Sequence, residues 1–145
     1  MTRIVTEHPL KRSLQSIPVD DSLKSDEGWG DEVAGMAVRW IVTDRTVGAE
    51  RHVVGLTVFQ PGARHRPHRH PHAEEAQYLI EGQGLARVGD VDIEQSAGDT
   101  VFVPRNEWHG FEATGEGETV MLWTYGGAPS LEAAGYVPQE RDDQG

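Results

Sequence analysis

The most informative stretch of this chain is Gly62-Ala63-Arg64-His65-Arg66-Pro67-His68-Arg69-His70-Pro71-His72-Ala73-Glu74-Glu75, which holds four of its seven histidines. His68 and His70 are two residues apart, and residues at this spacing point to the same face of an extended segment. Their imidazoles can therefore be directed at one point. Glu75 opens the next predicted strand after a short turn, and a hairpin would bring its carboxylate back beside the two histidines.

A third imidazole comes from His109, which begins another predicted strand after Pro104 and a short loop. Three imidazoles and one carboxylate form a four-ligand site suited to a borderline divalent metal ion. A shifted turn would instead present His72 in place of Glu75 and give an all-histidine site. A histidine-rich loop that is merely exposed is the competing interpretation, and the pattern around the segment favours a true metal site.

Short runs rich in β-branched and aromatic residues lie on both sides of this segment, separated by Gly, Pro and Asp turns. These runs cover residues 37–43, 52–59, 77–81, 85–88, 100–103, 109–113 and 119–125. Such spacing is typical of a β-sandwich or barrel, and no long run has the 3.6-residue period of a helix. We therefore predict an all-β fold, with one barrel because no internal repeat is present.

The two ends of the chain are expected to lie outside the barrel. Residues 1–35 are polar, broken by Pro and Gly, and predict an N-terminal arm. Residues 36–126 form the predicted barrel, and residues 127–145 a loosely packed C-terminal extension. We also predict a homodimer that uses part of residues 1–35, since exposed strand edges favour pairing between subunits.

Composition excludes several classes of function. The chain has no cysteine, so disulfides, thiolate nucleophiles and cysteine-based zinc sites are ruled out. Its formal net charge is -11, with 24 acidic and 13 basic residues, which argues against a nucleic-acid partner. No apolar run is long enough to cross a bilayer, and the first residues lack the apolar stretch of a signal peptide. A cytoplasmic location is expected.

Two motifs resemble those of the cupin family. Gly62-x5-His68-x-His70-x4-Glu75-x6-Gly82 resembles the first cupin motif in full, and Gly98-x5-Pro104-x-Asn106-x2-His109 resembles the second. Asn106 and Ala113 depart from it, standing where the family often has Gly and Asn, but neither position binds metal in the family. The resemblance implies a single cupin barrel, a double-stranded β-helix or jelly roll, with the metal inside its mouth. We predict one divalent metal ion held by His68, His70, Glu75 and His109, with zinc first and iron, nickel or manganese as alternatives that the same donor set could hold.

The alternation of strand residues predicts which side chains share the cavity. If Glu75 faces inward, Gln77 and Leu79 do so too, and Phe111 follows His109. On the last strand either Met121 with Trp123, or Leu122 with Thr124, faces inward. We expect His65 at the rim. The side chains expected to contact a small-molecule substrate are Gln77, Trp108, Phe111 and Trp123, and Glu75 and Gln77 are the predicted catalytic residues.

The run His68-Arg69-His70-Pro71-His72-Ala73-Glu74-Glu75-Ala76-Gln77-Tyr78, with the small acidic single domain, also resembles the monocupin aromatic polyketide cyclases. This resemblance implies a metal-dependent cyclase that closes rings in a poly-β-ketone chain during antibiotic biosynthesis. A metal-dependent dioxygenase acting on an aromatic or enol substrate is the alternative within enzymes, and an isomerase is a further one. A non-enzymatic cupin that binds a small molecule is the alternative outside them.

Overall fold

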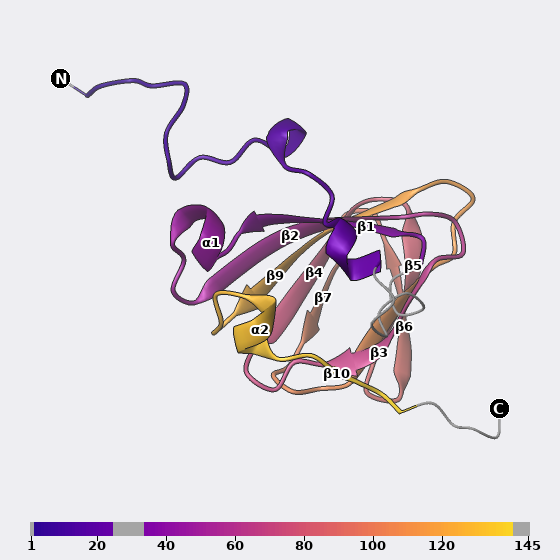
Figure 1. Ribbon diagram of the computed structural model, residues 1–145. Coiled ribbons are helices and arrows are strands. Elements are labelled where there is room, and N and C mark those ends of the chain that lie inside the picture. Colours follow the sequence, from indigo (N-terminus) through magenta and orange to yellow (C-terminus); the bar gives the residue numbers. More distant parts are fainter. Residues whose placement is uncertain (1, 25–33, 141–145) are drawn as a thin grey trace.

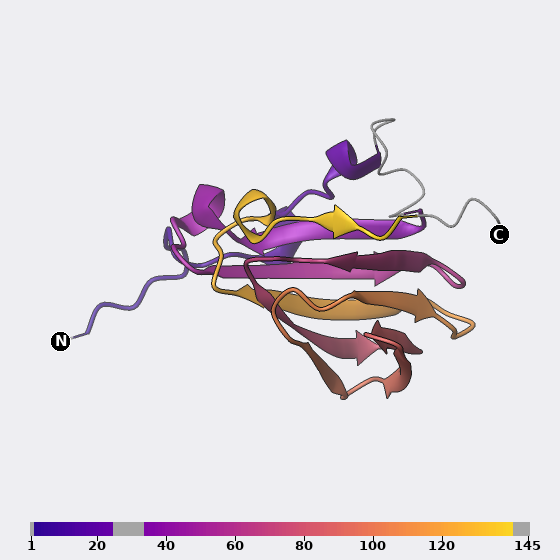
Figure 2. The same ribbon diagram turned by 90° about the horizontal axis from the view of Figure 1, so that it is seen from below.

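Strands dominate the computed structural model, which describes residues 2–24 and 34–140, and form two antiparallel sheets that face each other (Figure 1, Figure 2). The first sheet has the order β1 (Met36–Val42), β2 (His52–Phe59), β9 (Thr119–Gly126), β4 (Glu74–Glu81) and β7 (Thr100–Val103). The second has the order β10 (Val137–Pro138), β3 (Arg64–Arg69), β8 (His109–Ala113), β5 (Gln83–Val88) and β6 (Val91–Ser96).

The all-β jelly-roll prediction is confirmed, but the barrel is not closed. Within the described residues, strand pairing does not join one sheet to the other. The edge strands are β1 and β7 in the first sheet and β10 and β6 in the second, and none of them pairs with a described strand of the other sheet. The molecule is therefore a sandwich that leaves a cavity between its two layers, and not a continuous barrel.

All seven predicted strands are present, with small shifts at their ends, and the histidine-rich segment forms β3. The prediction missed β6 and β10. Most side chains of β6 are exposed, with only Gln95 buried, so this strand lacks the apolar alternation that marks the others. It exists because its backbone pairs with β5 from Gln83↔Ser96 to Val88↔Val91.

The absence of long helices is also confirmed in the described residues, where every helix has three or four residues. These are the 3₁₀ turns η1 (Leu14–Ser16) and η2 (Asp21–Lys24) and the α-helices α1 (Asp44–Val47) and α2 (Leu131–Ala134). Thr43 and Thr46 form a capping box at the start of α1. None of these turns has the length and apolarity needed to span a membrane.

The C-terminal segment is better packed than expected. Up to residue 140 the predicted loose extension is wrong, because Val137 and Pro138 pair with β3 and Ala134 is fully buried. The first described residues extend away from the sheets (Figure 1), but Ile17 is buried and the backbone N–H of Asp20 donates to the carbonyl of Val38 at 2.8 Å. The arm therefore stays a prediction. Residues 25–33 and 141–145, which belong to the predicted arm and extension, lie outside the described residues. The domain boundaries, the homodimer and the cytoplasmic location stay predictions.

The two sheets bury one continuous core between them. On β9 the residues alternate strictly between buried and partly buried positions, and Met121, Trp123 and Tyr125 point inward. This settles the alternatives for the last strand in favour of Met121 with Trp123. Gly55 on β2 lies directly opposite Trp123, and a Cβ at Gly55 would be 2.1 Å from the indole. Glycine at this position is therefore what allows the large ring to face inward.

Candidate metal centre and cavity

Three buried imidazoles meet at one end of the space between the sheets. His68 lies in β3, His70 follows that strand directly, and His109 begins β8, where it pairs with His68 in the strand register. One ring nitrogen from each residue lies within 4.8 Å of those of the other two. The exposed fractions of the three side chains are only 1–2%, so water reaches none of them freely.

The other ring nitrogens fix how the imidazoles are turned. Nδ1 of His68, His70 and His109 lies 2.7, 2.7 and 2.9 Å from the backbone oxygens of Arg66, Gly135 and Glu107, respectively. A carbonyl can only accept, so each Nδ1 must carry the hydrogen and each neutral ring keeps a lone pair on Nε2. Nε2 of His70 and of His109 is buried and has no hydrogen-bond partner among the described residues. Such orphaned lone pairs, backed by carbonyl groups, are the arrangement in which histidines bind metals.

Glu75 completes this group from the opposite sheet. Its Oε1 atom lies 3.3 Å from Nε2 of His70 and 3.6 Å from Nε2 of His109. Glu75 is 7% exposed, whereas the side chain of His72 is exposed to solvent. The structure therefore brings Glu75, and not His72, beside the three imidazoles.

The charges in the group suit a cation. Burial on its own would raise the pKa of Glu75, but His109 and His70 hold it well below its ordinary value. Burial lowers the pKa of His68 well below its ordinary value, and the other histidines lower it further. His109 differs: burial would lower its pKa, but the attraction and hydrogen bond of Glu75, together with Glu107, outweigh burial and raise it. An ionised carboxylate beside three imidazoles with converging ring nitrogens is a donor set that fits a divalent metal ion.

Asn106 supports the ligand loop at the position where the second cupin motif has glycine. Its φ angle is 67°, in the left-handed region, which Asn tolerates better than most residues. Its backbone N–H donates to the carbonyl of His70 at 3.0 Å, and its Oδ1 accepts from Arg69 at 2.5 Å. The departure from the motif thus leaves the loop tied to the ligand strand.

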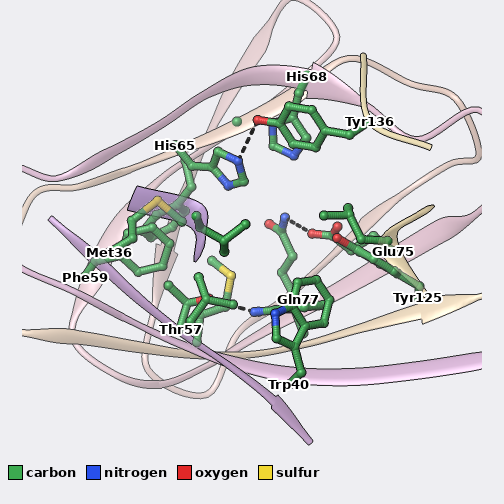
Figure 3. A pocket seen from close by; sticks show the side chains of 17 residues that line it. Met36, Trp40, Thr57, Phe59, His65, His68, Glu75, Gln77, Tyr125 and Tyr136 are labelled. Carbon is green, nitrogen blue, oxygen red and sulfur yellow. Dashed lines mark hydrogen bonds between the residues drawn. The ribbon is translucent and has the colours of Figure 1, made fainter. Parts of the chain in front are cut away.

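A narrow, mostly apolar cavity leads to the histidines (Figure 3). Apolar and aromatic side chains from both sheets form most of its wall, among them Met36, Val38, Trp40, Phe59, Phe111 and Trp123. The polar groups gather at the far end, where His65, His68, Glu75, Gln77 and Tyr136 lie. No lysine or arginine lines this cavity within the described parts of the chain. The space is suited to an uncharged apolar or aromatic group with polar atoms at one end.

Of the predicted substrate contacts, Gln77, Phe111 and Trp123 line the cavity, and Trp108 does not. The guanidinium carbon of Arg69 lies 5.1 Å from the ring centroid of Trp108, so this indole packs against a cation outside the cavity instead. Trp123 also lies in the wall with its Nε1 donating to Thr57 Oγ1 at 2.8 Å, which removes a polar hydrogen from the cavity.

The sequence did not indicate Tyr125 and Tyr136, which both lie at the polar end of the cavity. The rings of Tyr125 and His70 have centroids 4.7 Å apart, and alternation from Trp123 could have placed Tyr125 there. Tyr136 comes from the C-terminal segment, stacks on His68 with centroids 4.7 Å apart, and its hydroxyl lies 3.1 Å from Nε2 of His65. Burial lowers the pKa of His65 to about 3, so this ring is neutral.

Comparison with known proteins agrees with this geometry. Residues 55–125 match the Cupin domain family. The protein SchB of Streptomyces halstedii is 30% identical over 110 residues, which cover 76% of this chain and 80% of SchB. This chain belongs to the cupin family. The cupin is also 28% identical over 106 residues to the polyketide synthase CurC of Streptomyces cyaneus, covering 73% of this chain and 69% of CurC.

Two further similarities bear on function and fold. The dimethylsulfoniopropionate lyase DddW of Ruegeria pomeroyi is 38% identical to this cupin over 103 residues, covering 68% of this chain and 64% of DddW. Among solved structures, the polyketide cyclase RemF from Streptomyces resistomycificus superposes with a TM-score of 0.69 at 21% identity, covering 99% of this chain and 88% of RemF. At that identity the superposition shows a shared fold.

Proposed function

We propose that this cupin is a polyketide cyclase that closes rings in a poly-β-ketone chain during aromatic polyketide biosynthesis. The observation that carries the proposal is the position of three imidazoles and one carboxylate at the end of an aromatic cavity without cationic side chains. A poly-β-ketone is uncharged along its length and rich in ketone oxygens, which suits both parts of that space. The names of CurC and RemF support the same substrate class.

His68, His70, His109 and Glu75 would hold one divalent metal ion, which we take to be zinc. When bound, such an ion acts as a Lewis acid that polarises a ketone oxygen and acidifies the neighbouring C–H group. Oε1 of Glu75 faces the imidazoles, so Oε2 is the carboxylate atom on the side of Gln77 and the cavity. In this proposal Glu75 Oε2 accepts the proton from the ligand.

Gln77 and the aromatic walls would orient the chain. Nε2 of Gln77 donates to Oε2 of Glu75 (Figure 3). The amide oxygen of Gln77 is therefore left as an acceptor for an enol hydroxyl. Trp40, Phe111 and Trp123 restrict the flexible chain to shapes that bring its reacting carbons together, which lowers the entropic part of the barrier. We include a homodimer in the proposal, formed with part of residues 1–35.

A lyase is the second candidate, because DddW is the relative with the higher identity. Removal of a proton next to a carbonyl group is a step that elimination and ring closure can share, so one site could serve either reaction. The rings of Trp40 and Trp123 could also attract a sulfonium cation. The lack of Lys and Arg in the described wall favours a neutral ketone over a carboxylate substrate.

The test supplies the purified cupin with a poly-β-ketone chain made by a minimal polyketide synthase, and follows products by chromatography and oxygen with an electrode. A ring-closed product formed without oxygen uptake, and lost in Glu75→Gln and His109→Ala, supports the cyclase. Oxygen uptake would overturn the cyclase proposal in favour of a dioxygenase. Release of dimethyl sulfide from dimethylsulfoniopropionate would overturn it in favour of a lyase. Ligand binding without any turnover would overturn it in favour of a binding protein.

A further inference from the structure

A second hollow lies directly outside the cavity. It is bounded by the N-terminal arm, the region of α1 and the start of α2, and three of its side chains, Leu23, Trp40 and Leu131, also line the cavity. These three side chains are therefore the partition between the inner cavity and this outer hollow. A ligand that reaches the histidines from the outer hollow has to pass them.

The two spaces differ in size. The centre of a water molecule can reach about 50 Å³ in the inner cavity and about 340 Å³ in the outer hollow. Sites for drug-sized ligands measure roughly 300–1,000 Å³. The inner cavity therefore accommodates only the reacting end of such a molecule, and the remainder needs the outer hollow.

Trp40 is held at the junction from both sides. Its Nε1 donates to Oδ2 of Asp20, a residue of the outer hollow, at 2.8 Å. Its ring meets that of Trp123, a residue of the inner cavity, edge to face with centroids 5.2 Å apart. The position of the indole thus depends on one residue from each space.

The outer hollow is polar and carries a negative net charge. Oγ1 of Thr43 and Oγ of Ser130 each accept a backbone N–H, at 3.1 and 3.0 Å, so each hydroxyl still has a hydrogen to donate to a ligand. Among the described residues, three carboxylates line the hollow, those of Asp20, Asp44 and Glu132, and they outnumber its one guanidinium, that of Arg45, which lies 3.7 Å from Glu132. Hydroxyl donors with excess carboxylates suit an uncharged, hydroxyl- or amide-bearing group and repel anions.

We propose that the outer hollow is a second subsite of the same binding site. It takes the uncharged polar end of an elongated ligand whose apolar end lies in the inner cavity, and Trp40 separates the two ends. The subsite proposal rests on the proposed function in one respect: it assumes that the reacting end of the ligand binds in the inner cavity.

The test uses three probes with one aromatic head and measures their affinities by calorimetry. The probes are phenol, phenol carrying a hydroxyl-terminated ethylene glycol chain, and phenol carrying a chain of the same length that ends in a carboxylate. We expect the neutral chain to improve affinity over phenol by about fivefold, the factor for one hydrogen bond of average net strength. We expect the carboxylate chain to bind more weakly than the neutral one.

Charge reversal at the outer hollow gives a second measurement. Asp44 is exposed and its side chain makes no hydrogen bond in the described chain, so Asp44→Lys should fold normally. It should improve the affinity for the carboxylate probe by about threefold, the effect of one exposed charge pair. Asp90→Lys makes the same change of charge at an exposed turn outside the hollow and should leave all three affinities unchanged.

The outcomes separate the two proposals. The outer subsite is wrong, and the inner site stands, if phenol binds but neither attached chain changes the affinity of the probe. The same conclusion holds if Asp44→Lys and Asp90→Lys change the affinity for the carboxylate probe equally. If none of the three probes binds, both the subsite and the apolar inner site are wrong. The subsite is supported if the neutral chain raises affinity over phenol and if, of the two lysine variants, only Asp44→Lys raises the affinity for the carboxylate probe.

Discussion

Nε2 of Gln77 donates a hydrogen bond of 2.5 Å to Oε2 of Glu75, so the amide of one residue fixes the rotation of the carboxylate of the other. The low pKa of Glu75 means that the carboxylate is ionised and can only accept. The amide nitrogen must therefore be the atom that faces Glu75, and the amide oxygen must face the cavity. One buried side chain both orients a metal-site carboxylate and presents an acceptor to the ligand.

Gln77→Leu should weaken metal binding and activity together. Leucine keeps the apolar contacts but removes the donor, and losing a partner that orients a metal ligand costs roughly tenfold or more in metal affinity. Competition with a chromogenic chelator measures that affinity. Gln83→Leu makes the same change on an exposed strand position and serves as the control. Equal affinities in the two variants would show that Gln77 does not position Glu75.

His68→Ala and His109→Ala should each abolish metal binding, because each removes one of three converging ring nitrogens. His72→Ala should retain one equivalent of metal, since that side chain is exposed. Elemental analysis of protein purified without chelators decides between these outcomes. Metal lost in His72→Ala and kept in Glu75→Gln would restore the all-histidine site.

The metal-binding pattern could be predicted because it is local. His68 lies on β3 and His70 directly follows it, two residues on, and Glu75, Gln77 and Leu79 repeat that spacing on β4, so alternation predicts that all five point inside, where they are buried. His109 lies far along the chain, and it was predicted from its place at the start of another strand after Pro104, with support from the second cupin motif.

The groups that hold the metal-binding side chains in place could not be predicted, because segments distant in the sequence supply them. His70 is held by the carbonyl of Gly135, 65 residues away, and every residue offers such a carbonyl. Tyr136 is brought to His68 by a two-residue strand pairing that has no sequence pattern. The outer hollow depends in the same way on Asp20 and Leu131 meeting at Trp40.

Gly55→Ala should destabilise the fold and displace Trp123. The added Cβ would lie 2.1 Å from the indole, which has to move out of the cavity wall. Overpacking of this kind costs roughly 1–3 kcal/mol in the free energy of unfolding. Urea denaturation followed by tryptophan fluorescence reports both effects. Gly117→Ala is the control, since nothing lies within 4 Å of its Cβ position. Similar losses in both variants would mean that the close approach to Trp123 is unimportant.

The Asp20–Trp40 hydrogen bond should make part of the stability depend on pH. Burial raises the pKa of Asp20, but hydrogen bonds from Ser22 and Trp40 outweigh it and leave the pKa below its ordinary value of 3.8. A carboxyl group whose pKa is lower in the folded state stabilises the fold above its unfolded pKa, and the contribution is lost as the pH falls through the folded value. Asp20 is only partly buried, so we expect about 1 kcal/mol at most after screening by solvent.

Asp20→Asn removes that charge, so the difference in unfolding free energy between the native chain and this variant should shrink as the pH is lowered from about 6 to about 3. Trp40→Phe keeps the carboxylate and removes one of its donors, so it should reduce the same pH dependence in part. Urea denaturation at several pH values provides the comparison. A difference between the native chain and Asp20→Asn that stays constant over this range would mean that the ionised form of Asp20 does not hold Trp40 at the junction of the two spaces.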